Sequence, residues 1–260
     1  MKLRSVLDRL ILVRCLARAA RPRHQVSVLT VVAVIGVKQR LARNRPLTLH
    51  LAIGDFVVDE LADLMAISEV LVGGEYAVDG LAPATIVDVG SHIGASVVFF
   101  RDRYPDAEII AVEPDPLSFA KLRTNTARLS KVELRNHAVA DRNGEAPFHV
   151  ASHGWSSSLL EPPGARCSTT IQVRTLDDVV GPRSVGLLKL DIEGAEYEVL
   201  RAFRGLGRVQ AIAVEYHARA SSASLAAFLA LLDGFEIVSL RGDSAHNLTI
   251  IAVRADAAPR

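Results

Sequence analysis

Short runs rich in Val and Ile alternate with helical patterns from Thr85 onward, and this order constrains the fold more than any other feature of the chain. Such alternation is typical of β-α-β units, which build a parallel sheet covered by helices. The predicted strands are Thr85 to Val89, Glu108 to Glu113, Val132 to Val139, Val185 to Asp191, Val209 to Tyr216, Phe235 to Leu240 and Leu248 to Val253. We therefore expect an α/β fold with a seven-stranded, mostly parallel sheet.

The last two predicted strands require a different pairing. Only the seven residues "RGDSAHN" join them, which is too short for a crossover helix between parallel strands. The last strand is therefore predicted to be antiparallel to its neighbours.

The chain divides into three parts. Residues 1–45 are predicted to form a basic, amphipathic and helical N-terminal extension, and residues 46–83 a lead-in segment with a strand-like run, "LTLHLAIGDFVV", and a helix. Residues 84–256 form the main domain, in which residues 145–175 alternate like an antiparallel hairpin insertion. With 260 residues, 50% of them hydrophobic, the chain can bury one large core.

Charge separates the extension from the rest of the chain. Residues 1–45 hold eleven Lys and Arg and one acid, Asp8, whereas the remainder carries 19 basic and 28 acidic residues. The extension either binds an anionic membrane surface as a peripheral contact or packs on the body of the protein. Its apolar run Val26 to Val37 is shorter than the roughly 20 residues that span a bilayer. Two cysteines without metal-ligand spacing suit a cytoplasmic protein, and we expect no nucleic-acid partner.

The run "IVDVGSHIG" has the outline of a nucleotide-binding turn, with a buried strand followed by a glycine corner. Its glycines, Gly90 and Gly94, lack the G-x-G-x-x-G spacing of a dinucleotide site. Glu113 follows Gly90 by 23 residues, where an acid at the end of the second strand binds a ribose diol. The corner is thus predicted to bind a nucleoside without a pyrophosphate.

Acids stand at four predicted strand ends, namely Asp88, Glu113, Asp191 and Glu215. In an open parallel sheet, ligands bind beyond the carboxyl ends of the strands, so these acids should ring one pocket. Carboxylates repel phosphate and accept hydrogen bonds from hydroxyl and ammonium groups. S-adenosyl-L-methionine, which has a ribose, a cationic sulfur and no phosphate, fits this rim better than NAD.

Several motifs resemble, in order and spacing, the FkbM family of S-adenosylmethionine-dependent methyltransferases. They are "IVDVGSHIG", "AVEPDPLSFAKLRTN", "NHAVAD", "WSSSL", "VRTLDDVV", "LLKLDIEGAEYEVL" and "VEYH". The resemblance implies a Rossmann-like class I methyltransferase fold and O-methylation of a hydroxyl on a sugar, glycolipid or polyketide-type metabolite. One departure is Ser91-His92, where the family usually has Ala-Asn.

The resemblance also implies which residues bind the cofactor. Asp88 and Gly90 would line the methionine end, and Glu113, supported by Asp115, would accept from the ribose hydroxyls. Asn136 to Ala138 would flank the adenine. Asp191 would face the methyl group and the acceptor.

Methyl transfer to a hydroxyl is helped by a base that removes the proton. The candidate catalytic residues are His217, Asp191 and Glu193, in that order, because His217 follows a strand end and its ordinary pKa is near about 6.5. We assign no metal ligands; the alternative is a divalent cation held by Asp191, Glu193 and Glu196. Two rival functions are an NAD-dependent oxidoreductase and a non-catalytic membrane- or partner-binding module on the same fold.

Overall fold

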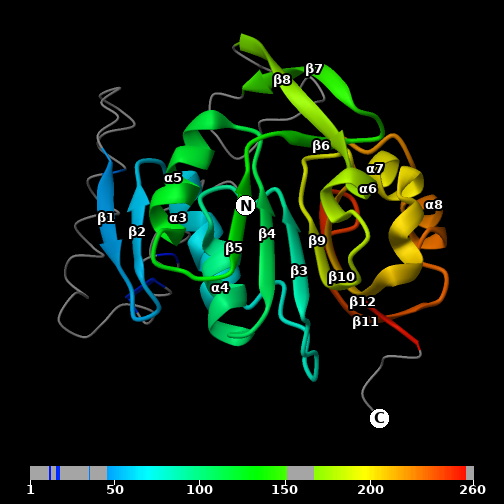
Figure 1. Cartoon of the computed structure of the whole chain (residues 1–260), viewed down its shortest axis with the longest axis horizontal. Helices are drawn as coiled ribbons and strands as arrows, with labels where there is room; N and C mark the ends of the chain where they lie inside the picture. Colours follow the sequence, from blue (N-terminus) through cyan, green and yellow to red (C-terminus); the bar gives the residue numbers. More distant parts are fainter. Residues whose placement is uncertain (1–11, 13–15, 18–34, 36–45, 151–166, 256–260) are drawn as a thin grey trace.

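The computed structural model describes residues 46–150 and 167–255, together with Leu12, Leu16, Ala17 and Ile35 (Figure 1). The rest of the predicted extension and the centre of the predicted insertion lie outside the described residues. Leu12, Leu16 and Ile35 are buried and belong to a core cluster with residues of the sheet. Within the part of the chain that is described, no helix has both the length and the apolar character needed to cross a bilayer.

Seven strands form the central sheet of the described chain, in the order β11-β12-β10-β9-β3-β4-β5. Their bounds are β3 Thr85–Val89, β4 Glu108–Val112, β5 Val132–Arg135, β9 Val185–Leu190, β10 Val209–His217, β11 Phe235–Gly242 and β12 Asn247–Arg254. The pairs among β5, β4, β3, β9 and β10 are all parallel, whereas β12 is antiparallel to both β10 and β11. The predicted mostly parallel sheet with an antiparallel last strand is confirmed.

The predicted strand Val132 to Val139 is wrong as a single element. The chain leaves the central sheet after β5, and β6, Ala138–Ala140, pairs instead with β8 in a second sheet. Asn136 lies at the break, where its Nδ2 donates to the carbonyl oxygens of Glu113 and Pro114 at 2.8 and 3.1 Å. The polar residues Arg135, Asn136 and His137 mark the break in the sequence, between two short strand-like runs that the prediction joined.

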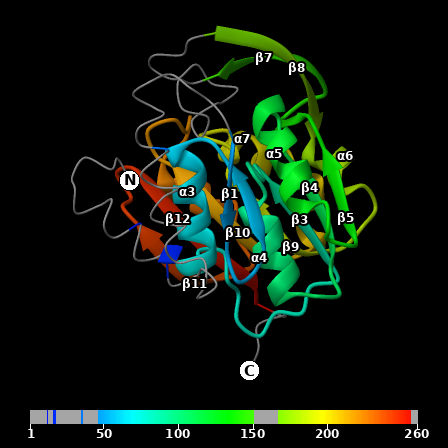
Figure 2. The ribbon, with the colours of Figure 1, turned by 90° about the vertical axis from the view of Figure 1, so that its left-hand side faces the viewer.

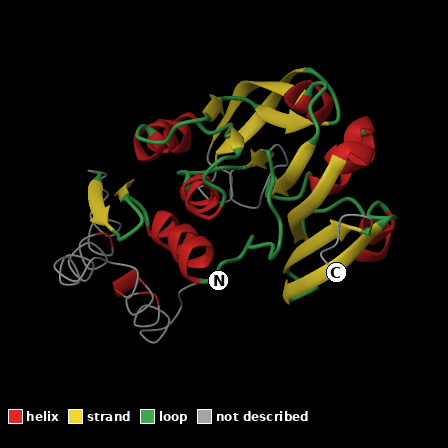
Figure 3. Cartoon of the chain, turned by 60° about the horizontal axis from the view of Figure 1, so that its bottom comes forward, coloured by secondary structure: helices red, strands yellow, loops and turns green. Residues whose placement is uncertain are grey.

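Helices cover both faces of the central sheet (Figure 3). Along each strand, successive side chains enter opposite cores, as in β3, where Ile86 packs with one cluster and Val87 and Val89 with the other. The first cluster includes residues of α3 Leu61–Ile67, α4 Ala95–Arg103 and α5 Pro116–Thr126. The second includes residues of α6 Leu176–Val180, α7 Glu196–Ala202 and α8 Leu225–Ala230. Two buried faces explain the continuous apolar runs in the sequence.

The lead-in segment packs against α5 of the main domain. Its strand-like run is two strands, β1 Leu47–His50 and β2 Asp55–Val58, which form an antiparallel pair, and α3 continues into the π-helical segment Ser68–Val72 (Figure 2). Lys121 of α5 donates to Asp59 at 2.7 Å and to the buried Asp63 at 2.9 Å. This ion-pair group fixes α3 beside the glycine corner of the main domain.

The insertion contributes a small second sheet, in which the described strands have the order β6-β8-β7. The strands β7, Gly144–Val150, and β8, Cys167–Thr175, pair antiparallel and project at the top of the molecule in Figure 1. Phe148 of β7 is nevertheless buried. The hairpin thus places one large apolar side chain over the sheet.

Candidate active site

A cavity of about 260 Å³ lies beyond the carboxyl ends of β3, β4, β9 and β10. Four parts of the chain line it. Gly90, His92 and Glu113 form the first part, which we call the cofactor corner. Asp191, Glu193 and Glu215 form the second, and we call them, together with the buried His217 beside them, the acidic end. The other two parts are an apolar wall of Ala138, Val139 and Phe148, and a wall from the lead-in segment with Ala62, Ala66, Glu69 and Glu75.

Gly90 allows the cofactor corner to form. Its φ is +80°, a left-handed conformation that favours glycine. A Cβ at this position would lie 1.8 Å from the carbonyl oxygen of Asp191, so any side chain would push β3 and β9 apart. Gly90 was predicted to let the cofactor approach the backbone closely, and it does line the cavity. The group that leaves no room for a side chain at Gly90, however, is the Asp191 carbonyl just after β9.

Glu113 is 6% exposed, and its two carboxylate oxygens are oriented by the backbone. The N–H groups of His92 and Asp115 each donate to one oxygen at 2.8 Å. Burial raises the pKa of Glu113 to about 7 in spite of these two donors. The carboxylate lies at the cavity, where its remaining lone pairs can accept hydrogen bonds from a diol.

His92 occupies the position where the family usually has Asn. Its φ is +47°, in the left-handed region where Asn, Asp and His occur more often than other non-glycine residues. Burial and the nearby Lys121 lower the pKa of His92 to about 4, so the imidazole is neutral. The departure from Asn therefore keeps the backbone geometry that directs the His92 N–H to Glu113.

Three predicted cofactor residues support the corner from behind rather than line the cavity. Asp88 is fully buried; it accepts from Ser96 Oγ at 2.5 Å and lies 3.3 Å from Lys189 Nζ. Asp115 caps α5 by accepting from the Leu117 N–H at 3.0 Å. Asn136 braces the end of β4, as described above. Of the four acids expected to ring the pocket, Asp88 thus faces the protein interior, whereas the predicted Ala138 does line the cavity.

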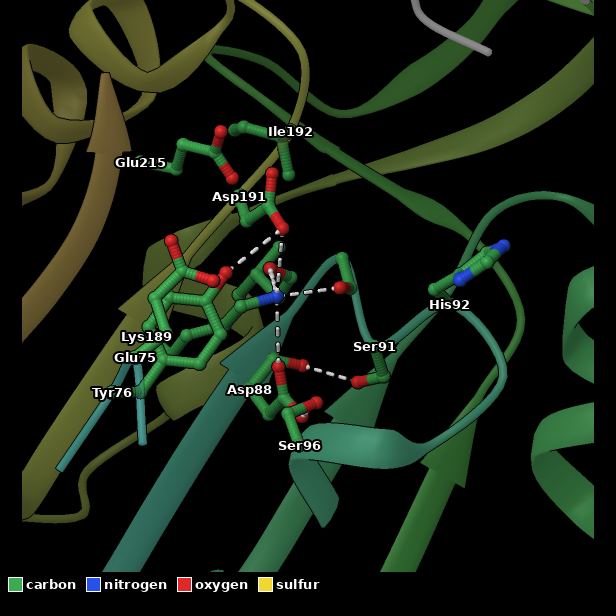
Figure 4. A network of polar contacts seen from close by, with 12 residues as sticks. Glu75, Tyr76, Asp88, Ser91, His92, Ser96, Lys189, Asp191, Ile192 and Glu215 are labelled. Atoms are coloured by element: carbon green, nitrogen blue, oxygen red, sulfur yellow. Dashed lines mark hydrogen bonds and ion pairs between the residues drawn. The ribbon is translucent and has the colours of Figure 1, made fainter. Parts of the chain in front are cut away.

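Lys189 was missed by the sequence analysis, although a lysine in the apolar run "VGLLKL" is unusual. It is 1% exposed, and its Nζ donates to the Gly90 carbonyl oxygen at 2.6 Å (Figure 4). The same Nζ lies 3.5 Å from Asp191 Oδ2 and 5.2 Å from the ring centre of Tyr76. Lys189 thus joins the ends of β3 and β9 with one buried charge.

Tyr76 brings the lead-in segment into this network. Its hydroxyl donates to Asp191 Oδ2 at 3.2 Å, as Figure 4 shows. Burial would raise the pKa of Asp191, but Lys189 and His217 outweigh it, and the pKa is lowered. Asp191 is therefore ionised, with one oxygen held by Tyr76 and Lys189 and the other directed toward His217.

The acidic end surrounds the imidazole of His217 with carboxylates. Nδ1 of His217 lies 2.8 Å from Glu196 Oε1, and Nε2 lies 3.5 Å from Glu193, 3.8 Å from Glu215 and 3.9 Å from Asp191. Burial lowers the pKa of His217, but the Glu196 bond and the other carboxylates raise it to about 11. In this state the imidazole is a cation without a free lone pair, which argues against His217 as the base.

Glu193 and Glu215 line the cavity at this end. Burial and the charge of Asp191 raise the pKa of each to about 8. Glu193 has a φ of +56°, a strained conformation that turns the chain between β9 and α7. The candidates Asp191 and Glu193 thus lie together with His217, and Glu215 joins them.

Comparison with known proteins agrees with this geometry. The model of the methyltransferase FkbM domain matches residues 88–236, more than half of the chain. The 2-O-methyltransferase NoeI of Sinorhizobium fredii is 29% identical over 177 residues, which cover 59% of this chain and 73% of NoeI.

Two further relatives match over shorter shares. Methyltransferase sdnD of Sordaria araneosa is 27% identical, over 45% of this chain and 59% of that protein. The 31-O-demethyl-FK506 methyltransferase FkbM of Streptomyces tacrolimicus is 26% identical, over 53% of this chain and 67% of its own length. By its motifs, its sheet and the matched domain, this chain belongs to the FkbM family of S-adenosylmethionine-dependent methyltransferases.

Proposed function

We propose that this protein transfers a methyl group from S-adenosyl-L-methionine to a hydroxyl oxygen of a sugar, glycolipid or polyketide-type metabolite. The observation that carries the proposal is one cavity with two chemically different ends. The cofactor corner presents a single carboxylate aligned by backbone N–H groups, and the acidic end presents several carboxylates around one imidazole.

The residues at the cofactor corner suit a nucleoside with a cationic end. Glu113 has lone pairs for the ribose hydroxyls, and Ala138, Val139 and Phe148 form an apolar wall for the adenine. The ammonium group of Lys189 is directed to Gly90 and two aspartates, so it does not offer a phosphate site. This donor set favours S-adenosylmethionine over NAD.

The chemistry is the displacement of a methyl group from a positively charged sulfur, which the cofactor supplies when bound. The protein has to align the acceptor hydroxyl and to remove its proton. Alignment of two reactants supplies much of the rate of such reactions. We assign proton removal to Asp191 or Glu193, because both carboxylates line the cavity, whereas the pKa of His217, raised to about 11 by the surrounding carboxylates, disfavours it as a base.

The acceptor class follows from the charge of the cavity and the names of two relatives. Carboxylates accept hydrogen bonds from the hydroxyls of a polyol and repel phosphorylated acceptors. NoeI is named a 2-O-methyltransferase and the Streptomyces relative acts on a demethylated FK506 oxygen, as its name states. Both names support an oxygen acceptor for this chain.

Calorimetric titration with S-adenosylmethionine and with NAD separates the proposal from its first rival. We expect binding of S-adenosylmethionine alone. Tight NAD binding without S-adenosylmethionine binding would favour the oxidoreductase, and binding of neither would favour a non-catalytic module.

Mass spectrometry of metabolites and lipids identifies the acceptor. Cells with and without the gene should differ in a compound that loses about 14 Da, the mass of one CH₂, when the gene is removed. Fragmentation should place this methyl group on oxygen; a methyl group on nitrogen or carbon would contradict O-methylation.

A further inference from the structure

Three potential ligand atoms converge at the acidic end of the cavity. Asp191, Glu215 and His217 each offer one oxygen or nitrogen, and these atoms all lie within 4.8 Å of one another. His217 Nε2 lies 3.9 Å from Asp191 Oδ1 and 3.8 Å from Glu215 Oε1. Both distances exceed those of a hydrogen bond. The three atoms therefore face a shared space without bonding to each other.

This spacing is close to that between ligands of one metal ion. Oxygen and nitrogen ligands lie roughly 2.0 to 2.2 Å from Mg²⁺ or Zn²⁺, so two ligands of the same ion lie about 2.8 to 3.6 Å apart at coordination angles of roughly 90 to 110°. The observed 3.8 and 3.9 Å are slightly longer than that interval. Binding of a single ion would therefore draw the three side chains slightly closer together.

The orientation of His217 is fixed by a carboxylate on its other nitrogen. Glu196 is fully buried, and its Oε1 accepts from the N–H groups of Ile192 and Gly194 at 3.0 and 3.1 Å. Because this oxygen is an acceptor of two backbone donors, Nδ1 of His217 must be the donor in their 2.8 Å contact. A carboxylate that binds the far nitrogen is the usual support of a metal-binding histidine.

The second nitrogen of His217 has more distant partners. The side chain is 7% exposed, and the ion pairs of Nε2 are 3.5 Å to Glu193, 3.8 Å to Glu215 and 3.9 Å to Asp191. Nε2 therefore faces Glu193, Glu215 and Asp191, and a cation bound there would replace the proton of Nε2. Glu196, an alternative metal ligand in the sequence-based prediction, instead supports His217 from its far nitrogen.

Charge at this end also favours a cation. Four carboxylates, those of Asp191, Glu193, Glu196 and Glu215, lie within 4 Å of the imidazole. Lys189 approaches only the Oδ2 of Asp191, which leaves Oδ1 for a ligand. Figure 4 shows the carboxylates of Asp191 and Glu215 together, and both residues line the cavity. An ion here would be in contact with whatever fills this end.

We propose that Asp191, Glu215 and His217 bind a divalent cation, of the Mn²⁺ or Mg²⁺ class, which holds an acceptor hydroxyl at the acidic end of the cavity. Two carboxylates and one imidazole leave coordination positions open for water and for the acceptor. The cation lowers the pKa of the hydroxyl that it binds, so that a neighbouring carboxylate can remove the proton. The proposal that the cation holds the acceptor hydroxyl rests on the proposed methyl transfer. Binding of the cation to the protein does not depend on that reaction.

Calorimetric titration of the full-length protein with Mn²⁺, in the absence of acceptor, tests the site. Wild type should bind one Mn²⁺, and Glu215→Gln should weaken the affinity by at least about tenfold. Glu75→Gln is the matched control, because Glu75 also lines the cavity and accepts from a neutral side chain, Thr249, as Glu215 does from Asn247. Its Mn²⁺ affinity should stay within about threefold of wild type. Thermal unfolding of each variant verifies that it is folded.

Failure of this proposal is distinguishable from failure of the proposed function. If wild type binds S-adenosylmethionine but no Mn²⁺ or Mg²⁺ at millimolar concentration, the cation site is overturned and methyl transfer stands. Equal Mn²⁺ affinity in wild type and Glu215→Gln overturns it as well. Methyl transfer should stop after treatment with EDTA and return when Mn²⁺ is added in excess. Transfer that continues at the same rate in EDTA would contradict the proposal that the cation holds the acceptor hydroxyl.

Discussion

The two ends of the cavity hold their carboxylates in opposite ways. At the cofactor corner, both oxygens of Glu113 accept backbone N–H groups at 2.8 Å, and Gly90 is fixed against the neighbouring strand. At the acidic end, Glu196 contacts His217 at 2.8 Å, and three other carboxylates form longer ion pairs of 3.5 to 3.9 Å with the imidazole. One end is preorganised by the backbone, and the other leaves charged groups facing one another across a gap.

This difference indicates that the two ends bind different ligands. A carboxylate whose position is set by the backbone suits a ligand that is the same in every turnover. An end where charged groups face one another across a gap suits the acceptor, a proton in transit or a cation. Lys189 connects the two ends, since it contacts Gly90 on one side and Asp191 on the other.

The largest effect is expected when this connection is removed. Lys189→Met leaves the buried Asp88 and the partly buried Asp191 without their shared cation. Breaking a buried ion pair on one side costs about 3 to 5 kcal/mol, and we expect that loss in the free energy of unfolding, measured by urea denaturation. Lys131→Met is the control: Lys131 is half exposed, 3.7 Å from Asp106, and its loss should cost less than about 1 kcal/mol. Equal losses in the two variants would contradict a connecting role for Lys189.

The next effect comes from the corner itself. Gly90→Ala places a methyl group against the Asp191 carbonyl at a φ of +80°. We expect a loss of at least about 2 kcal/mol in the free energy of unfolding, together with loss of S-adenosylmethionine binding. Gly207 provides the comparison, because a Cβ at that position would have nothing within 4 Å, and Gly207→Ala should preserve binding. Normal binding by Gly90→Ala would show that the corner is not built as described.

Cofactor affinity should depend on pH through Glu113. Burial raises its pKa to about 7, and the ionised form is the better acceptor for ribose hydroxyls. Lowering the pH through 7 protonates the carboxylate, so the Kd at pH 6 should be about tenfold weaker than at pH 8. Calorimetry of Glu113→Gln should show a flat profile over the same range. A profile in the variant as steep as in wild type would assign the dependence to another group.

The smallest effect is expected from the lead-in segment. Tyr76→Phe removes only the hydroxyl that donates to Asp191 and keeps the ring beside Lys189. A single hydrogen bond contributes about 0.5 to 1.5 kcal/mol, so kcat should fall roughly 2- to 10-fold. Tyr104→Phe removes a hydroxyl that donates to the Val78 carbonyl oxygen, and should leave kcat unchanged. A larger loss in Tyr104→Phe than in Tyr76→Phe would contradict a direct role for Tyr76.

Most strands, their mostly parallel pairing and the gathering of acids at one edge could be predicted from the sequence, because these follow from chain-local patterns. Val- and Ile-rich runs mark the strands, and a residue at the end of a parallel strand lies at the binding edge whatever its partners are. Glu113, Asp191 and Glu215 reach the cavity in this way. Asp88 does not, because its side chain is bound by Ser96, eight residues later, and by Lys189 on another strand.

What the sequence did not predict depends on contacts between distant segments. Tyr76 reaches Asp191 across 115 positions, and Phe148 lines the cavity only because the hairpin folds back over the sheet. Contacts between distant segments also explain why Asp191 or Glu193, rather than His217, is now the preferred base. The raised pKa of His217 comes mainly from Glu196, Glu193 and Asp191, which lie more than 20 positions earlier in the chain and which the fold brings to the imidazole.

The division between the two ends is tested most directly by the affinity for S-adenosylmethionine of Glu113→Gln and Glu215→Gln, measured side by side without divalent cations. Loss of a hydrogen bond to a charged group costs about 1.5 to 3 kcal/mol, so Glu113→Gln should weaken the Kd by at least about tenfold. Glu215→Gln should stay within about threefold of wild type. Equal weakening in both variants, or a larger loss in Glu215→Gln, would contradict the assignment of cofactor and acceptor to separate ends of the cavity.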